Sequence, residues 1–116
     1  MKKILIVFVL VLFAGVITSY AQDTVSAANS KDFIGKTVFV KGKVADVFTS
    51  KSGNIFIQFD DKNPNQTFTA AILNGVQLDL TNIKPGCTLT VFGEIKEYKD
   101  KPEIILEKQE QIIKVE

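Results

Sequence analysis

The sequence predicts an all-β domain, a five-stranded Greek-key barrel of the OB-fold type, because two apolar strands each contain a glycine at the same point. The strands are residues 38–44, which contain Gly42, and residues 91–95, which contain Gly93. A glycine inside an alternating strand is typical of a place where a long strand bends to close a small barrel. Such barrels bind oligonucleotides or oligosaccharides on one open face, so the pattern favours a binding module.

The expected elements follow the chain in OB-fold order. A short helix is expected to begin after a cap at Ser26 or Thr24, to run towards Ile34 and to end at Gly35. Such a helix can cover one end of a barrel. Alternating apolar residues predict strands at 37–48, 55–59, 66–73, 88–98 and 103–107, with 111–115 extending or following the last one.

A short helix is expected between the third and fourth strands, as an OB-fold usually has there. Val76, Leu80 and Ile83 lie at helical spacing within residues 74–83, and Pro85 stops the pattern. Alternation also predicts which strand residues point inward: Val38, Val40, Gly42, Val44, Ile55, Ile57, Phe59, Leu89, Val91, Gly93 and Ile95. The core or the barrel ends are further expected to hold Phe48, Phe59, Phe68 and Phe92.

Residues 1–21 have the pattern of a cleaved signal peptide. Lys2 and Lys3 form a basic start, residues 4–17 are apolar and uncharged, and Ser19 and Ala21 are small residues before the cleavage point. The apolar run is shorter than the roughly 20 residues that span a bilayer, although an uncleaved anchor is the alternative. We therefore expect an OB-fold domain at 22–116, periplasmic or secreted, with no membrane attachment after cleavage.

The charge balance argues against tight, sequence-independent binding of nucleic acid. All 14 basic residues of the chain are lysines, and it has 13 acidic residues. Without Lys2 and Lys3, 12 lysines face 13 acidic residues, a net charge of −1 for the exported chain. Affinity for phosphates comes largely from many cations, and lysine lacks the bidentate fork of arginine.

The composition also predicts a protein that is not an enzyme and that uses no metal or cofactor. The chain has no histidine, the usual acid–base group near neutral pH and a common zinc ligand. Asp60 and Asp61 are adjacent, so on a strand they point to opposite faces, and they open a loop. Cys87 is the only cysteine, which excludes an intramolecular disulfide and favours a small buried thiol.

Several short motifs, in this order, carry a resemblance to a known group. They are Gly35-Lys36, Val40-x-Gly42-x-Val44, Gly53-x-x-Phe56-x-x-Phe59, Pro64-x-x-x-Phe68 and Val91-x-Gly93-x-Ile95-x-x-Tyr98-x-x-x-Pro102-x-Ile104. The chain resembles exported bacterial OB-fold proteins that carry a domain of the tRNA anticodon-binding, helicase-type nucleic-acid-binding kind.

In the anticodon-binding relatives, an aromatic residue of the second strand stacks on a base, and Phe56 matches that position. The leucine and arginine that follow in the family are replaced by Phe59 and Asp60. The resemblance therefore implies a stacking platform without the phosphate-binding part of the motif.

The candidate binding surface interleaves aromatic and cationic side chains, the combination that sequence-tolerant stacking on single strands requires. Its residues are Phe39, Lys41, Lys43, Phe56, Gln58, Tyr98, Lys99 and Lys101. The alternative is structural, with Phe39 and Phe56 covering apolar surface under the N-terminal helix and the lysines solubilising strand edges.

Two functions are expected from this surface. The first is binding of single-stranded nucleic acid or an oligonucleotide, which the resemblance implies. The second is a periplasmic interaction or stress-tolerance module that binds a protein, a glycan or a small envelope ligand through the same face.

Overall fold

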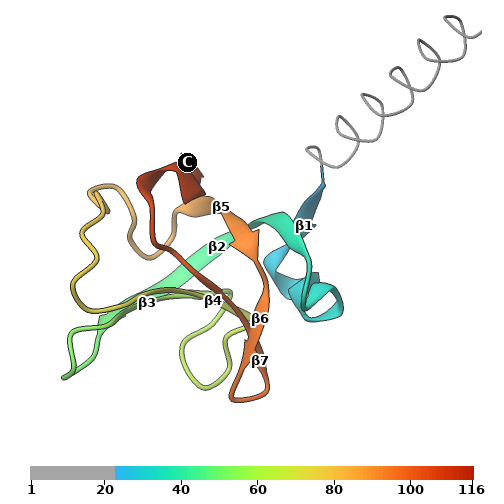
Figure 1. The fold of residues 1–116 in the computed structure, drawn as a ribbon, viewed down its shortest axis with the longest axis horizontal. Coiled ribbons are helices and arrows are strands. Elements are labelled where there is room, and N and C mark those ends of the chain that lie inside the picture. Colours follow the sequence, from blue (N-terminus) through green and yellow to red (C-terminus); the bar gives the residue numbers. More distant parts are fainter. Residues whose placement is uncertain (1–22) are drawn as a thin grey trace, which may run out of the picture.

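The computed structural model describes residues 23–116, which form eight strands and two short 3-10 helices (Figure 1). The strands are β1 (Thr24–Ser26), β2 (Thr37–Thr49), β3 (Ile55–Phe59), β4 (Phe68–Ile72), β5 (Thr88–Glu94), β6 (Lys96–Tyr98), β7 (Lys101–Ile105) and β8 (Ile112–Val115). The helices are η1 (Ala27–Phe33) and η2 (Gln109–Gln111). The predicted signal peptide, residues 1–21, lies outside the described residues. None of the helices within 23–116 is long and apolar enough to cross a membrane.

The strands pair in the order of an OB-fold. The long strand β2 pairs antiparallel with β5 through residues 37–43 and with β3 from Val44 onward, with a register shift between Val44 and Asp46. β3 pairs antiparallel with β4, β4 pairs parallel with β7, and β7 pairs antiparallel with β6, the continuation of β5. This circuit returns to β2, so the sheet closes into a Greek-key barrel as predicted.

The strand count exceeds the expected five for three reasons. β1 adds a short parallel edge beside β2, and β8 follows the η2 helix to pair antiparallel with β5. The predicted fourth strand divides into β5 and β6 at Ile95, whose N–H donates to Lys36 O (2.9 Å) and whose carbonyl accepts from Gly35 N (2.7 Å). These bonds take the backbone of Ile95 out of the ladder while its side chain stays fully buried.

The barrel interior confirms most of the inward residues predicted from alternation. Fully or almost fully buried are Val38, Val40, Val44, Ile57, Phe59, Leu89, Val91 and Ile95, together with Phe68 from β4. The expected N-terminal helix is present as η1, with Ala27 and Ser30 buried; the Ser30 hydroxyl donates to the Ala27 carbonyl (2.7 Å). A Cβ on Gly42 would lie only 2.6 Å from the Ala27 Cβ, so this glycine lets η1 approach the bent strand.

The helix predicted at 74–83 is wrong. The segment between β4 and β5 contains turns but no helix. Val76, Leu78 and Leu80 pack against the core, whereas Gln77 and Asp79 between them are exposed. A period of two is that of an extended chain, which here lies along the barrel. Leu78 shows the difference, because it packs against the core but was not part of the predicted helical pattern.

Two phenylalanines expected in the core or at the barrel ends lie elsewhere. Phe48 is 51% exposed near the end of β2. Phe92 is half-buried on the outer face of β5, where its ring packs against Phe39 with 4.7 Å between centroids. Phe92 lies between the inward residues Val91 and Gly93, so the pleat alone turns it outward.

The 73–87 segment is tied to η2 by a reciprocal pair of hydrogen bonds. Asp79 N donates to Gln109 Oε1 (2.7 Å), and Gln109 Nε2 donates to the Asp79 carbonyl (3.2 Å). The Thr81 hydroxyl and N–H donate to the Asp79 carboxylate, and these bonds lower the pKa of that exposed group. The segment is therefore held by polar contacts to η2 as well as by its apolar side chains.

We expect Gln109→Ala to lower the free energy of unfolding by about 1 kcal/mol, because it removes both bonds to the Asp79 backbone. Amide hydrogen exchange is expected to accelerate within 73–87 and to stay unchanged in β2. Glu110→Ala, in the same short helix and without such contacts, is the matched control. Equal destabilisation by the two variants would contradict the anchoring role.

Candidate functional site

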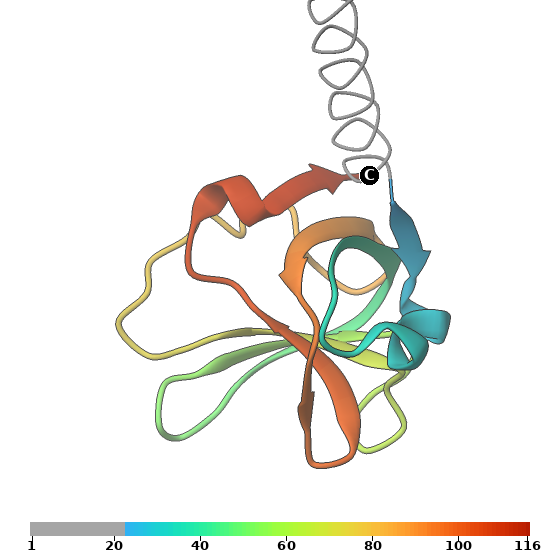
Figure 2. The ribbon, with the colours of Figure 1, turned by 45° about the vertical axis from the view of Figure 1, so that its right-hand side comes forward.

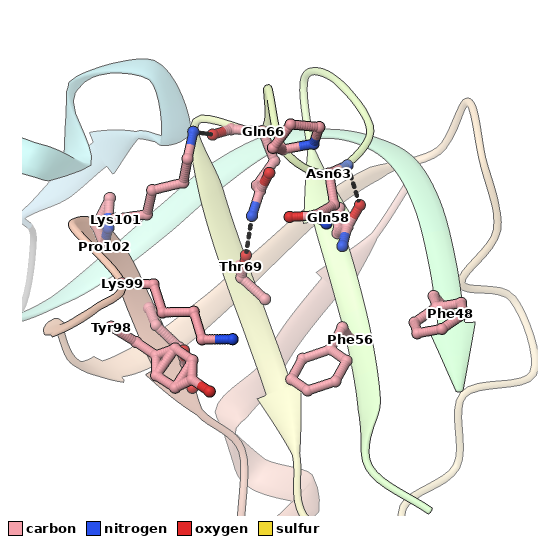
Figure 3. Close-up of a pocket in the computed structure, with 12 residues that line it drawn as sticks. Phe48, Phe56, Gln58, Asn63, Gln66, Thr69, Tyr98, Lys99, Lys101 and Pro102 are labelled. Carbon is pink, nitrogen blue, oxygen red and sulfur yellow. Dashed lines mark hydrogen bonds between the residues drawn. The ribbon is translucent and has the colours of Figure 1, made fainter. Parts of the chain in front are cut away.

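A pocket of about 330 Å³ opens on the outer face of β3, β4 and β7 (Figure 3). In Figures 1 and 2 the β2–β3 turn, the loop 60–67 and the β6–β7 hairpin all project from the same lower side of the barrel. The pocket lies between the last two of these, so its floor is sheet and its walls are loops. This is the open face on which OB-folds bind their ligands.

Five of the eight predicted binding residues line this pocket. Phe56 and Gln58 come from β3, Tyr98 from β6, Lys99 from the hairpin turn, and Lys101 from β7. Figure 3 shows Tyr98 and Lys99 reaching from the hairpin over the sheet towards Phe56. The structure thus brings together side chains that are more than 40 positions apart in the sequence.

The other three predicted residues, all in the first half of β2, are not among the residues that line the pocket. Phe39 packs on Phe92, and the Lys41 ammonium lies 3.7 Å from the Glu116 carboxylate. Lys43 is exposed just before the register shift, where its carbonyl accepts from Asp60 N (2.8 Å). Because β2 changes partner from β5 to β3 along its length, its two halves contribute to different parts of the outer surface.

Three aromatic side chains surround the pocket. Phe48 and Tyr98 are each 51% exposed, and Phe56 is half-buried. Phe48 and Phe56 are register partners across β2 and β3, so their side chains lie side by side on one face. Large aromatic groups left in solvent around one concavity are typical of a surface that is covered when a partner binds.

The β6–β7 hairpin holds Lys99 in a strained conformation over the pocket. Tyr98 and Lys101 are paired, so Lys99 and Asp100 form a two-residue turn, and their φ angles are 51° and 66°. Such turns favour asparagine or glycine, because a positive φ is costly for a long side chain. The Lys99 ammonium lies 5.3 Å from the centre of the Tyr98 ring. Strain retained at a pocket rim is an indication of function.

Hydrogen bonds tie the loop 60–67 to Gln58 and Lys101, which were predicted as site residues, through Asn63 and Gln66, which were not. Asn63 N donates to Gln58 Oε1 (2.6 Å), and Lys101 Nζ donates to the Gln66 carbonyl (3.0 Å). Gln66 Nε2 in turn donates to Thr69 Oγ1 (3.5 Å). The remaining pocket residues that sequence reasoning missed are Phe48, Asn63, Pro64, Gln66, Thr69, Pro102 and Glu103. The alternation in β4 and β7 was the only signal for Thr69 and Glu103.

Glu103 places a carboxylate in a pocket otherwise rimmed by lysines. Burial raises the pKa of the Glu103 carboxyl above its ordinary value, and the Lys96 ammonium, on the paired strand, acts in the opposite direction. A half-buried acid that is costly to ionise is typical of a binding or reactive site.

We expect Glu103→Gln to raise the free energy of unfolding near pH 7 and to have little effect near pH 4. Because the folded-state pKa is raised, the stability linked to this group is full below its unfolded pKa and is lost as the pH rises through the folded value. The glutamine side chain does not ionise, so the variant does not lose this stability at pH 7. Thermal unfolding at both pH values measures the effect, with exposed Glu97→Gln as control. A glutamine variant that is less stable at pH 7 would contradict this account.

Among residues 23–116, no group of three or more potential metal ligands is found. Asp60 accepts a hydrogen bond from the Thr67 hydroxyl, while Asp61 accepts one from Lys62 N (2.7 Å). The two adjacent carboxylates are thus each used within the loop that they open. Cys87, expected as a small buried thiol, is only partly buried, and it packs against the core.

No protein-family model matches the chain, and no curated protein matches it. Among solved structures, it is similar to a chain described as an aspartyl-tRNA synthetase from Leishmania major Friedlin, with 8% identity, a TM-score of 0.46, and coverage of 73% of this chain and 19% of that one. It is also similar to the asparaginyl-tRNA synthetase of Entamoeba histolytica, with 18% identity, a TM-score of 0.46, and coverage of 80% and 23%.

The chain therefore spans about a fifth of the length of these two synthetases. The OB-fold is defined by the strand pairing of the barrel itself.

Proposed function

We propose that the barrel is a non-catalytic module that binds single-stranded nucleic acid in the pocket on β3, β4 and β7. The observation that supports this best is a set of three aromatic rings, the exposed Phe48 and Tyr98 and the half-buried Phe56, around a concavity rimmed by Lys99 and Lys101. Bases stack on such rings, each stacked base contributing about 1 to 3 kcal/mol, while lysines lie near the backbone phosphates.

The small number of cations in the pocket sets the expected strength and salt dependence. Of the lysines in the part of the chain that the structure describes, Lys99 and Lys101 line the pocket, and Lys101 already donates to the Gln66 carbonyl. Two phosphate contacts give a shallow salt dependence, with a slope of log K against log salt of roughly −1.4 for a single strand. We therefore expect stacking, rather than charge neutralisation, to dominate the affinity.

The experiment is a fluorescence-anisotropy titration of the purified protein with a labelled single-stranded oligonucleotide at low and moderate salt. Lys99→Asn is expected to weaken binding several-fold and to flatten the salt dependence. Because asparagine tolerates a positive φ, the same variant is expected to be at least as stable as the parent. Weaker binding without loss of stability would show that Lys99→Asn removes a contact with the oligonucleotide and does not unfold the protein.

Lys41→Asn is the matched control, since Lys41 is an exposed lysine of β2 whose nearest ion pair is with Glu116. It is expected to leave the affinity unchanged. Equal losses for Lys41→Asn and Lys99→Asn, or the absence of any binding at low salt, would overturn the proposal.

A second candidate is a glycan or an envelope protein as the partner. It is favoured by the amide and acidic groups of the pocket, Gln58, Gln66 and Glu103, since sugar hydroxyls both donate and accept hydrogen bonds. Binding of a glycan array or an envelope fraction without salt dependence would support it.

We also propose that the protein is exported, on the strength of the sequence pattern in residues 1–21. Cell fractionation combined with mass determination of the purified chain tests this. A chain that begins at Gln22 in the periplasm or medium would support export, and an intact chain in the cytosol would contradict it.

A further inference from the structure

The strand register arranges the outer face of the barrel into an apolar row and a polar row. Phe48 and Phe56 are paired across β2 and β3 in the apolar row. The polar row begins at Gln58, two positions after Phe56 on β3. Gln58 pairs with Thr69 of β4, and Thr69 pairs with Glu103 of β7. Side chains paired in this way lie about 5 Å apart. A planar ligand stacked on the aromatic row would therefore present one edge to the polar row.

The polar row and the loop above it offer hydrogen-bond acceptors that are not used. Gln58 Oε1 is occupied by Asn63 N, but Gln66 Oε1 is buried and has no partner among the described residues. Gln66 is 9% exposed and lines the pocket. Glu103 has no cation within ion-pair distance in residues 23–116. A buried acceptor without a donor is costly, so a ligand that supplies donors here is favoured.

We propose, on the basis of the proposed function, that this pocket selects a guanine base. Guanine carries two neighbouring donors on its Watson–Crick edge, N1–H and the N2 amino group. A carboxylate can accept both at once, as it accepts two hydrogen bonds from an arginine. Uracil and thymine present one N–H between two carbonyl oxygens. These oxygens are acceptors, so they repel a carboxylate placed at that edge.

The lysines of the rim fit the same arrangement. Lys99 and Lys101 come from the β6–β7 hairpin at the rim of the pocket, so they are available to the phosphates of a nucleotide whose base is stacked inside. The acid selects the base while the cations hold the backbone, which explains why one pocket contains both charges. Burial also raises the pKa of Glu103, in keeping with a carboxylate that lacks donors until the ligand arrives.

The test compares three labelled pentamers that differ only at the central base, dTTGTT, dTTITT and dTTTTT, with the purified protein. Inosine keeps N1–H but lacks the N2 amino group. We expect dTTGTT to bind about ten-fold more tightly than dTTTTT, a difference of about 1.4 kcal/mol, with dTTITT between them. Competition by free GMP and UMP distinguishes a base within a strand from a mononucleotide.

Glu103→Gln is expected to bring the three pentamers within two-fold of one another. Asp46→Asn is the matched control, because Asp46 is paired with Gln58 on the same face but does not line the pocket. It is expected to keep the guanine preference. Loss of the preference in both variants, or equal affinity of the parent for all pentamers, would overturn the inference.

The outcomes separate this inference from the proposed function. Pentamers that all bind equally overturn only the guanine preference. Binding of GMP over UMP without binding of any pentamer overturns strand binding and supports the guanine pocket. If neither pentamers nor mononucleotides bind, both proposals are wrong.

Discussion

Gly42→Ala is expected to lower the free energy of unfolding by about 2 kcal/mol. The new methyl group would lie 2.6 Å from the Ala27 Cβ and 3.0 Å from the Phe59 ring, closer than carbon atoms approach in a packed core. Overpacking of this kind typically costs 1 to 3 kcal/mol. Either η1 must move away from the barrel or β2 must straighten where it bends. Chemical denaturation measures the loss as a lower midpoint with an unchanged m-value.

A double-mutant cycle identifies the contact responsible. Ala27→Gly removes the atom that the new methyl group meets first, so it is expected to restore part of the stability lost in Gly42→Ala. On its own, Ala27→Gly is expected to destabilise, because it removes a buried methyl group and adds backbone freedom. If the two losses simply add, the close approach of η1 to β2 is not the cause.

Phe56→Ala is expected to weaken binding of a single-stranded oligonucleotide by about ten-fold or more. Phe56 lies in the middle of the sheet floor, next to Phe48 by register and facing Tyr98 across the pocket (Figure 3). Loss of one stacked base costs about 1 to 3 kcal/mol. Anisotropy titration at fixed salt measures the change, and the salt dependence is expected to stay the same because no cation is removed.

Two controls separate stacking from packing. Phe39→Ala truncates a half-buried phenylalanine on the outer face of the same barrel, outside the pocket, and is expected to leave the affinity unchanged. Phe56→Trp keeps an aromatic ring and is expected to bind as well as the parent or better, whereas Phe56→Leu keeps only the apolar bulk. Equal affinity of the leucine variant and the parent would argue against stacking at this position.

The local pattern was sufficient for the long strands β2 and β5 because each of them buries one side. Alternation in 37–48, 55–59 and 88–98 predicted most of the inward residues. The glycines within two of these strands indicated bends, and the structure adds that a Cβ at Gly42 or Gly93 would meet a neighbouring side chain. The prediction from spacing was wrong in the segment between β4 and β5. In 74–83 the spacing of three residues suggested a helix, while the turns and the packing of Leu78 favoured an extended chain.

The candidate site was only half predictable for a different reason. Alternation places Phe39 and Phe56 on the outer side of their own strands. It does not reveal that β2 pairs with β5 at Phe39 and with β3 only from Val44 onward, so that Phe39 lies away from the pocket. Phe48 was expected in the core or at a barrel end because large apolar residues are usually buried. It is exposed because the second half of β2 turns this side chain to the open face.

The sequence by itself determined the strands, their inward sides and the glycines at the bends, since these depend on neighbours along the chain. Only the tertiary structure decided which outer side chains share a pocket. That choice depends on the parallel pairing of β4 with β7 and on the turn at Lys99 and Asp100, which bring Glu103 and Lys99 to the same face as Phe56. Contacts between residues so distant in the chain are set by barrel closure, which no local period encodes.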